Sequence, residues 1–131
     1  MHVIRLHGPW TAEFTGDDTE SRRVHLPRDW KEIGELVRQA PLRLMRRFHR
    51  PTGLGETTRV RLAIPAGWPV ASVGVNGEQV SESATVDERR RFDLSTIVRS
   101  RESHDLVIAF RTGEELAGQP YFVAIEIEER G

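Results

Sequence analysis

The chain has 131 residues, enough for one domain with one hydrophobic core. It contains no cysteine, which excludes disulfide bonds, thiolate metal sites and a cysteine nucleophile. Nineteen basic and twenty acidic side chains give a net charge of −1, so we expect no nucleic-acid partner. No apolar run approaches the ~20 residues of a membrane span, and the first residues lack the apolar stretch of a signal peptide. We therefore expect a cytoplasmic protein that binds no membrane.

The N-terminal third predicts a buried tryptophan and a short helix. Trp10 follows a Gly-Pro turn, and we expect its ring in the core. The segment 29–37 places apolar residues at helical spacing, which predicts a short helix despite a central glycine. Asp29 suits the N-terminal cap, with Glu32 three residues later as in a capping box. Trp30 lies on the apolar side of this helix.

The middle of the chain predicts strands. The apolar residues of 42–48 are flanked by arginines, and the segment 59–65 alternates strictly between aliphatic and polar side chains. Such alternation is typical of an antiparallel strand with one face in the core. Within 71–80, Asn76 and Gly77 separate two strand-like arms. They predict a tight hairpin, because a type I′ turn needs positive φ at both central positions.

The C-terminal third continues this pattern. We expect a single helical turn within 93–98 and a central strand at 104–110, which is almost entirely apolar. In 123–128 the aliphatic residues share one face, while Glu126 and Glu128 point away from it. Strands at this spacing, separated by frequent glycine and proline turns, predict an all-β sandwich or barrel.

Several segments occur in an order that is similar to a known family. In chain order they are Leu6–Trp10, Val24–Trp30, Arg46–Pro51, Val73–Gly77, Phe92–Ser95 and Leu106–Ile108. Together they resemble the N-terminal sugar-binding domain of family-two glycoside hydrolases, which include β-galactosidases, β-glucuronidases and β-mannosidases. The resemblance implies an antiparallel jelly-roll β-sandwich of the galactose-binding-domain-like class, with one or two short helices, and a single domain over residues 1–131.

The resemblance also implies a function. The family's catalytic carboxylates lie on a separate barrel, and 131 residues cannot supply a barrel of ~250 residues. We therefore expect a non-catalytic carbohydrate-binding module and no enzyme activity. Pro27 and Trp30 match a Pro-x-x-Trp segment through which the family's domain can contribute to the active site. The segment 113–121 is short and departs from the family's pattern, as does Asp105, where an asparagine is common.

Sugar binding needs an apolar platform for the pyranose ring and planar polar groups for its hydroxyls. The candidate contacts are Trp68, Trp30, Tyr121, Asp29, Gln119 and Glu114. For Trp30, packing against the core is favoured over sugar contact. Trp68, in a Gly-Trp-Pro loop, suits a lid over the end of the sandwich as well as an exposed stacking platform. The Tyr121 hydroxyl could instead bond a neighbouring carbonyl.

Other chemistries find little support in the sequence. Adjacent acids on a strand point to opposite faces, so they make no facing pair for glycoside cleavage. No two histidines have the spacing of metal ligands on a helix, although His25 and His49 could face each other on adjacent strands. No serine lies in a Gly-x-Ser-x-Gly elbow. The run Asp17-Asp18-Thr19-Glu20 could hold a structural calcium ion, but a polar turn is the favoured interpretation. We therefore expect no cofactor.

Two functions remain open at this point. The first is a non-catalytic sandwich that binds carbohydrate at one end. The second is a protein-interaction or structural module with the same fold and no sugar binding, for example a homodimer. This alternative predicts an apolar patch on one sheet face, or an edge strand that pairs between copies.

Overall fold

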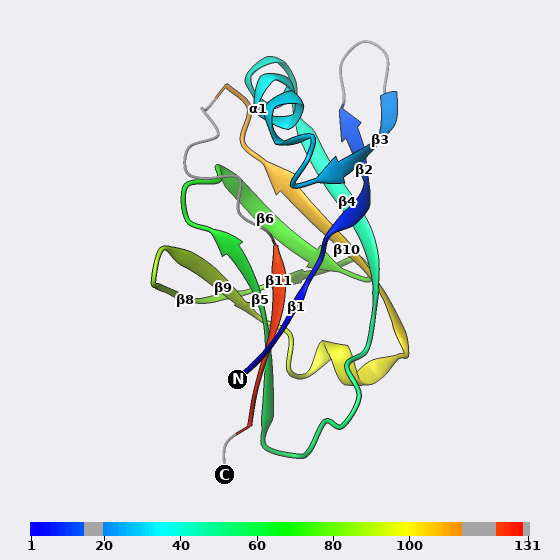
Figure 1. The fold of residues 1–131 in the computed structure, drawn as a ribbon, viewed down its shortest axis with the longest axis vertical. Helices are drawn as coiled ribbons and strands as arrows, with labels where there is room; N and C mark the ends of the chain where they lie inside the picture. Colours follow the sequence, from blue (N-terminus) through cyan, green and yellow to red (C-terminus); the bar gives the residue numbers. More distant parts are fainter. Residues whose placement is uncertain (15–19, 114–122, 130–131) are drawn as a thin grey trace.

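Two antiparallel sheets, stacked face to face, make up most of the structure (Figure 1). The computed structural model describes residues 1–14, 20–113 and 123–129. Within them, one sheet has the strand order β1-β11-β5-β9-β8 and the other the order β3-β2-β4-β10-β6-β7. The predicted all-β sandwich is confirmed, and the nearly continuous apolar strand β10 lies inside its sheet, between β4 and β6.

The bounds of the elements are as follows. The five-stranded sheet contains β1 (His2–Arg5), β5 (Thr58–Pro65), β8 (Glu82–Val86), β9 (Arg89–Asp93) and β11 (Ala124–Glu129). The six-stranded sheet contains β2 (Gly8–Phe14), β3 (Glu20–Leu26), β4 (Leu42–His49), β6 (Val70–Val75), β7 (Glu78–Val80) and β10 (Ser103–Phe110). The helices are α1 (Trp30–Gln39) and the 3₁₀ helix η1 (Ile97–Ser100).

Side chains from the inner faces of both sheets form one hydrophobic core. Val60, Leu62 and Ile64 of β5 are fully buried, as the alternation predicts. Trp10 of β2 is also buried, and its indole Nε1 donates to the main-chain oxygen of Leu6 at 2.9 Å. A buried indole N–H needs such an acceptor, and the predicted core position of Trp10 is confirmed.

The hairpin predicted at Asn76-Gly77 is confirmed. β6 and β7 pair on either side of it, and φ is 53° at Asn76 and 82° at Gly77. The Asn76 side chain also joins the turn to β10, because its Oδ1 accepts the N–H of Asp105 at 2.9 Å and its Nδ2 lies 2.9 Å from Nδ1 of His104. His104 is buried and stacks on Phe48, with ring centroids 5.2 Å apart. The turn is therefore held by its side chains as well as by its backbone.

One local expectation is corrected by the structure. The single helical turn begins later than 93–98, because Asp93 still belongs to β9 and η1 starts at Ile97. Glu126 points away from the aliphatic face of its strand, yet it is only 7% exposed. Arg91 of β9 reaches it across the intervening strand β5, with Nε 2.7 Å from Oε1. The residue of β5 opposite Arg91 is Ala63, whose small side chain leaves room for this contact.

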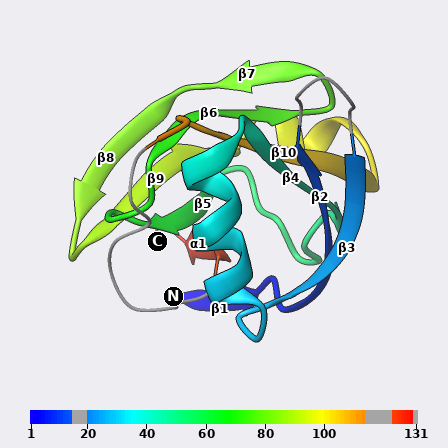
Figure 2. The same ribbon diagram turned by 90° about the horizontal axis from the view of Figure 1, so that it is seen from above.

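The helix α1 lies across one end of the sandwich, over the opening between the two sheets (Figure 2). Its residues Ile33 and Val37 are fully buried in the core. The opposite end carries η1 and the connection between β4 and β5 (Figure 1). No helix within the described residues has the length and apolar character to span a membrane.

Candidate functional site

Two of the predicted tryptophans meet at the end of the sandwich that carries α1. Trp30 is the first residue of α1, and Trp68 lies in the turn between β5 and β6. Their ring centroids are 4.6 Å apart with the planes tilted by 32°, and Trp68 also lies 5.8 Å from the ring of Phe110. Trp68 is only 1% exposed. Of the two roles left open for Trp68, the exposed platform is excluded and the covered position at the end of the sandwich remains, since neighbouring aromatic rings cover this ring.

Trp30 differs from Trp68 in its exposure. Its ring packs against the core through Trp68, yet the side chain is only half-buried. Trp10 and Trp68 are both buried, so Trp30 is the one tryptophan of the protein that offers ring surface to solvent. Its partly buried position fixes the ring, which lowers the entropy cost of stacking a ligand on it.

The carboxylate of Asp29 is held beside this ring. Asp29 stands at the N-cap position of α1, but its side chain makes no cap hydrogen bond, which corrects the expected capping box. Its Oδ2 instead accepts the main-chain N–H of His25 at 2.7 Å, and its Oδ1 lies 3.3 Å from Nε of Arg28. The His25 N–H and the Arg28 guanidinium hold the pKa of Asp29 below its usual value of 3.8. Asp29 is therefore an ionised acceptor at neutral pH.

A shallow hollow of about 380 Å³ lies over these groups. It is lined by Pro27, Arg28, Asp29, Trp30, Lys31 and Glu32. Glu32 forms an ion pair with Arg22 of β3, so its carboxylate is already engaged. The hollow thus combines one half-buried aromatic ring with a fixed carboxylate and two cationic side chains.

The other three predicted contacts, Glu114, Gln119 and Tyr121, lie outside the described residues, as do Asp17, Asp18 and Thr19 of the calcium candidate. The residue before the first group is nevertheless placed: Gly113 donates its main-chain N–H to the Val37 oxygen of α1 at 3.1 Å. Gly113 therefore lies beside α1, near the end of the helix opposite to Trp30. Within the described residues, no three His, Asp or Glu side chains are grouped to hold a metal ion.

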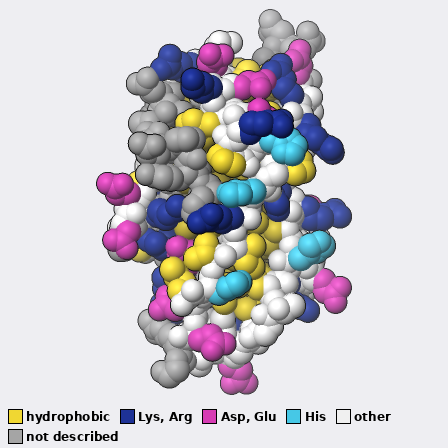
Figure 3. Space-filling model, in the orientation of Figure 1, with side chains coloured by type: hydrophobic (Ala, Val, Ile, Leu, Met, Phe, Trp, Pro, Cys, Tyr) yellow, Lys and Arg dark blue, Asp and Glu magenta, His cyan; other side chains and the backbone are white. Residues whose placement is uncertain are grey.

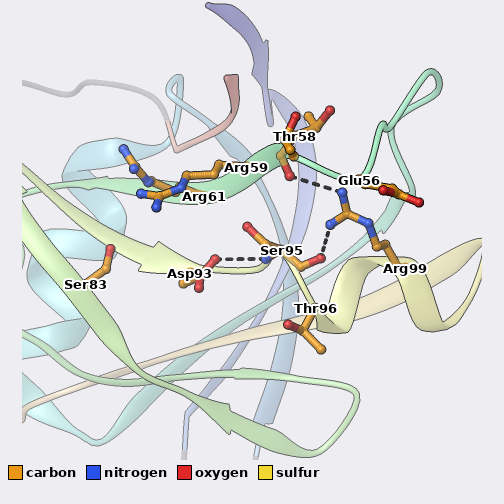
Figure 4. A pocket seen from close by; sticks show the side chains of 10 residues that line it. Glu56, Thr58, Arg59, Arg61, Ser83, Asp93, Ser95, Thr96 and Arg99 are labelled. Carbon is orange, nitrogen blue, oxygen red and sulfur yellow. Dashed lines mark hydrogen bonds between the residues drawn. The ribbon is translucent and has the colours of Figure 1, made fainter. Parts of the chain in front are cut away.

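Sequence reasoning missed a larger pocket at the opposite end, of about 770 Å³ (Figure 4). Arg99 spans one side of it and donates to the main-chain oxygens of Gly55 at 2.6 Å and Thr58 at 3.1 Å. Asp93 accepts the Ser95 N–H at 3.0 Å. This bond lowers the pKa of Asp93, and the charges of nearby arginines lower it further.

The chemistry of this second pocket is purely polar. Arg59 and Arg61 project from β5 beside the hydroxyl groups of Thr58, Ser95 and Thr96, and no aromatic ring lines the pocket (Figure 4). The arginines on the polar face of 59–65 are the part of the sequence that could have indicated this pocket. The alternating pattern by itself predicts only that they face solvent. Without a stacking surface, this pocket fits a pyranose ring less well than the hollow at Trp30.

Comparison of the sequence with protein-family models finds no match, and none of the curated proteins matches it. The structure, however, has clear neighbours. An FMN-binding β-glucuronidase from Facaelibacterium prausnitzii L2-6 superposes on it with a TM-score of 0.68 at 20% sequence identity, over 95% of this chain and 22% of that one. A β-D-glucuronidase from Dictyoglomus thermophilum gives 0.68 at 14% identity, over 98% of this chain and 28% of that one.

A putative β-galactosidase from Bacteroides fragilis also superposes with a TM-score of 0.68 at 14% identity, over 98% of this chain and 23% of that one. The chain thus spans less than a third of the length of the hydrolases that it matches, and a catalytic barrel has no counterpart in its described sandwich. At these identities the similarity shows the fold. The resemblance found in the sequence is confirmed for the fold, because almost the whole chain superposes on one part of these glycoside hydrolases.

Proposed function

We propose that this sandwich binds carbohydrate at the end that carries α1 and performs no reaction of its own. The observation that carries the proposal is the half-buried ring of Trp30, which is seated on the buried Trp68 and lies beside the ionised Asp29. The similarity of the fold to parts of a β-glucuronidase and a putative β-galactosidase supports a sugar as the ligand.

The proposed contacts divide by chemistry. The apolar face of a pyranose stacks on the exposed surface of Trp30, while Asp29 accepts hydrogen bonds from its hydroxyls. Arg28 and Lys31 supply donors on the rim of the same hollow. Glu114, Gln119 and Tyr121 remain part of the proposal, because they follow Gly113, which is bonded to α1.

A catalytic role fits this hollow poorly. Glycoside cleavage uses two carboxyl groups about 5–10 Å apart on opposite sides of the bond, one of them protonated. Here Asp29 has a lowered pKa, and Glu32 is paired with Arg22. Neither described acid of the hollow therefore suits the general acid.

The alternative, a protein-interaction or structural module without sugar binding, predicts an apolar patch on one sheet face or an edge strand that pairs between copies. Within the described surface, Met1 and Val3 are the only large hydrophobic side chains that are exposed. They are too few for an apolar patch, which weighs against that form of the alternative. We favour carbohydrate binding, because the hollow at Trp30 supplies both an aromatic ring and a carboxylate.

The test is calorimetric titration of the whole chain with a panel of neutral and acidic mono- and oligosaccharides. Binding of at least one sugar at millimolar concentration or below is expected, with loss in the Trp30→Ala variant. Phe14→Ala is the matched control, because Phe14 is also a half-buried aromatic residue but lies on β2, outside the hollow. The proposal fails if no sugar binds, or if both variants weaken binding equally.

A further inference from the structure

The sandwich is open along one side, between β1 and the neighbouring strands β2 and β4. A groove of about 560 Å³ lies there, which we call the edge groove. Its apolar part includes Leu6, Trp10 and Phe48, which belong to the core. Figure 3 looks onto this side and shows hydrophobic side chains between histidine and arginine side chains in its lower half.

The described residues that line the edge groove include basic side chains and no aspartate or glutamate. The basic ones are Arg5, Arg23, Arg46, Arg47 and His49; of these, Arg47 also forms an exposed ion pair with Asp105, outside the lining. The whole chain, by contrast, has nearly equal numbers of acidic and basic side chains. The groove is therefore a local positive site on a protein without net positive charge, which favours a negatively charged occupant.

Arg46 is the unusual residue of this group. It occupies an inward position of β4, between the buried residues Leu44 and Phe48. Its guanidinium donates to the main-chain oxygens of His7 at 2.8 Å and Arg47 at 3.1 Å, and it lies 5.9 Å from the Trp10 ring centroid.

All the partners of this guanidinium are thus neutral. Within the described residues, the Nε of Arg46 is buried without an acceptor. Burial also lowers the pKa of Arg46. A partly desolvated cation without a counter-charge is costly, and an incoming carboxylate would offset that cost.

The backbone of β4 offers a second recognition element in the same groove. β2 pairs with β3 over its whole length, but its other edge pairs with β4 only from Phe14↔Leu42 to Thr11↔Met45. Beyond Met45, β10 is the only strand that pairs with β4 in the described structure. Arg50 donates its N–H to Glu102 on the β10 side. By the alternation of antiparallel pairing, the main-chain groups of Arg47 and His49 therefore point into the groove.

We propose that the edge groove binds an extended acidic peptide segment of a partner protein, which adds as a strand to the free edge of β4 between Met45 and Arg50. Its main chain pairs with His49 and with the N–H of Arg47, since the Arg47 oxygen already accepts from Arg46. Its carboxylates contact Arg46 and Arg23, and its apolar side chains rest on Trp10 and Phe48. This binding surface is separate from the hollow at Trp30, and the inference does not depend on sugar binding.

The test uses the whole chain and a fluorescein-labelled hexapeptide of alternating glutamate and valine, followed by fluorescence anisotropy. The glutamate peptide is expected to bind, and the same peptide with lysine in place of glutamate is not.

Arg46→Gln should weaken binding about tenfold, the value of one charge-assisted hydrogen bond. Arg101→Gln, an equal loss of charge at an exposed position outside the groove, should leave binding unchanged. Should Arg46→Gln fail to fold, Arg23→Gln at an exposed position of β3 provides the same comparison.

Two N-methylated isomers of the peptide test the strand pairing itself. One carries the methyl groups on its valine nitrogens and the other on its glutamate nitrogens, so each blocks one edge of the peptide. One isomer should bind about tenfold more weakly than the other. The proposal is overturned if both isomers bind alike, if the lysine peptide binds equally well, or if an acidic oligosaccharide such as oligogalacturonate binds the groove and the peptide does not.

Discussion

At the scale of single residues, Trp30 and Trp68 share one ring contact but differ in exposure. Trp68 is covered by Trp30 and Phe110, whereas Trp30 keeps part of its surface in water. Trp68→Ala should therefore lower the free energy of unfolding by about 3–5 kcal/mol, and Trp30→Ala by clearly less. Urea unfolding followed by far-UV circular dichroism measures both changes. Equal losses would mean that Trp30 is a core residue with no surface to offer a ligand.

Asp29 should make stability depend on pH in the acid range. Its pKa in the folded protein lies below the usual value of 3.8, so folding favours the ionised form. The resulting stabilisation is present above the unfolded pKa and is lost as the pH falls through the folded pKa. Asp29→Asn keeps an acceptor for the His25 N–H but removes the charge. The difference in urea midpoint between the wild type and this variant should shrink from about pH 6 to about pH 2; a constant difference would contradict the assignment.

The sequence alone could not decide whether Trp68 is buried or exposed, or which main-chain group Asp29 binds. Trp68 was equally suited to a lid and to an exposed platform, because its Gly-Trp-Pro loop says nothing about what covers the ring. The structure decides the question through Phe110 and Trp30, which come from distant parts of the chain. Asp29 was expected to cap α1, but the spacing of residues cannot show that its carboxylate accepts the N–H of His25 on β3 instead.

At the scale of elements, the hairpin between β6 and β7 depends on its turn residues. Gly77 has a φ of 82°, and an added Cβ would meet no atom within 4 Å. Gly77→Ala should therefore cost about 1–2 kcal/mol of stability from backbone strain alone. Gly74, in strand β6 of the same hairpin, has room for a Cβ at ordinary contact distance, so Gly74→Ala is the matched control and should cause no loss. Thermal or urea unfolding of both variants checks this, and an equal loss would rule out strain as the cause.

Sheet pairing places a nearly buried ion pair on the five-stranded sheet. The side chains of Arg91 and Glu126 are 12% and 8% exposed, whereas Glu128, two residues further along β11, is 47% exposed and lies 3.7 Å from Arg61. Glu126→Ala should cost about 3 kcal/mol, because it leaves a desolvated guanidinium behind. Glu128→Ala should change stability by less than about 1 kcal/mol. Denaturant unfolding measures both, and similar small effects would show that the Arg91–Glu126 pair contributes little.

The elements themselves were largely predictable from the sequence. Alternation in 59–65 and the Asn-Gly turn are local signals, and both led to the observed strand and hairpin. The burial of Glu126 was not predicted, because it depends on Arg91 reaching across β5, which only the strand order decides. The free edge of β4 also escaped prediction, since it arises where the pairing of β2 with β4 ends at Thr11↔Met45.

At the scale of the whole molecule, the sequence indicated a sandwich and a ligand site at its rim. The structure places Trp30, Asp29 and Trp68 together at the end covered by α1, and Gly113 donates its N–H to this helix. The opposite end holds a larger polar pocket, and the open side holds the edge groove. Three separate surfaces thus surround one core, and their chemistry differs enough for ligands to distinguish them.

The measurement that tests the proposed function most directly is a proton–nitrogen NMR titration with a sugar identified by calorimetry. The protein has three tryptophans, so three indole N–H signals report on three environments. The signal of Trp30 should shift on saturation, with a smaller shift at the underlying Trp68. The signal of Trp10, whose N–H is bonded to Leu6 inside the core, should stay in place. Unchanged signals for Trp30 and Trp68 at saturation, or a shift of Trp10 as large as that of Trp30, would contradict a carbohydrate site at this end of the sandwich.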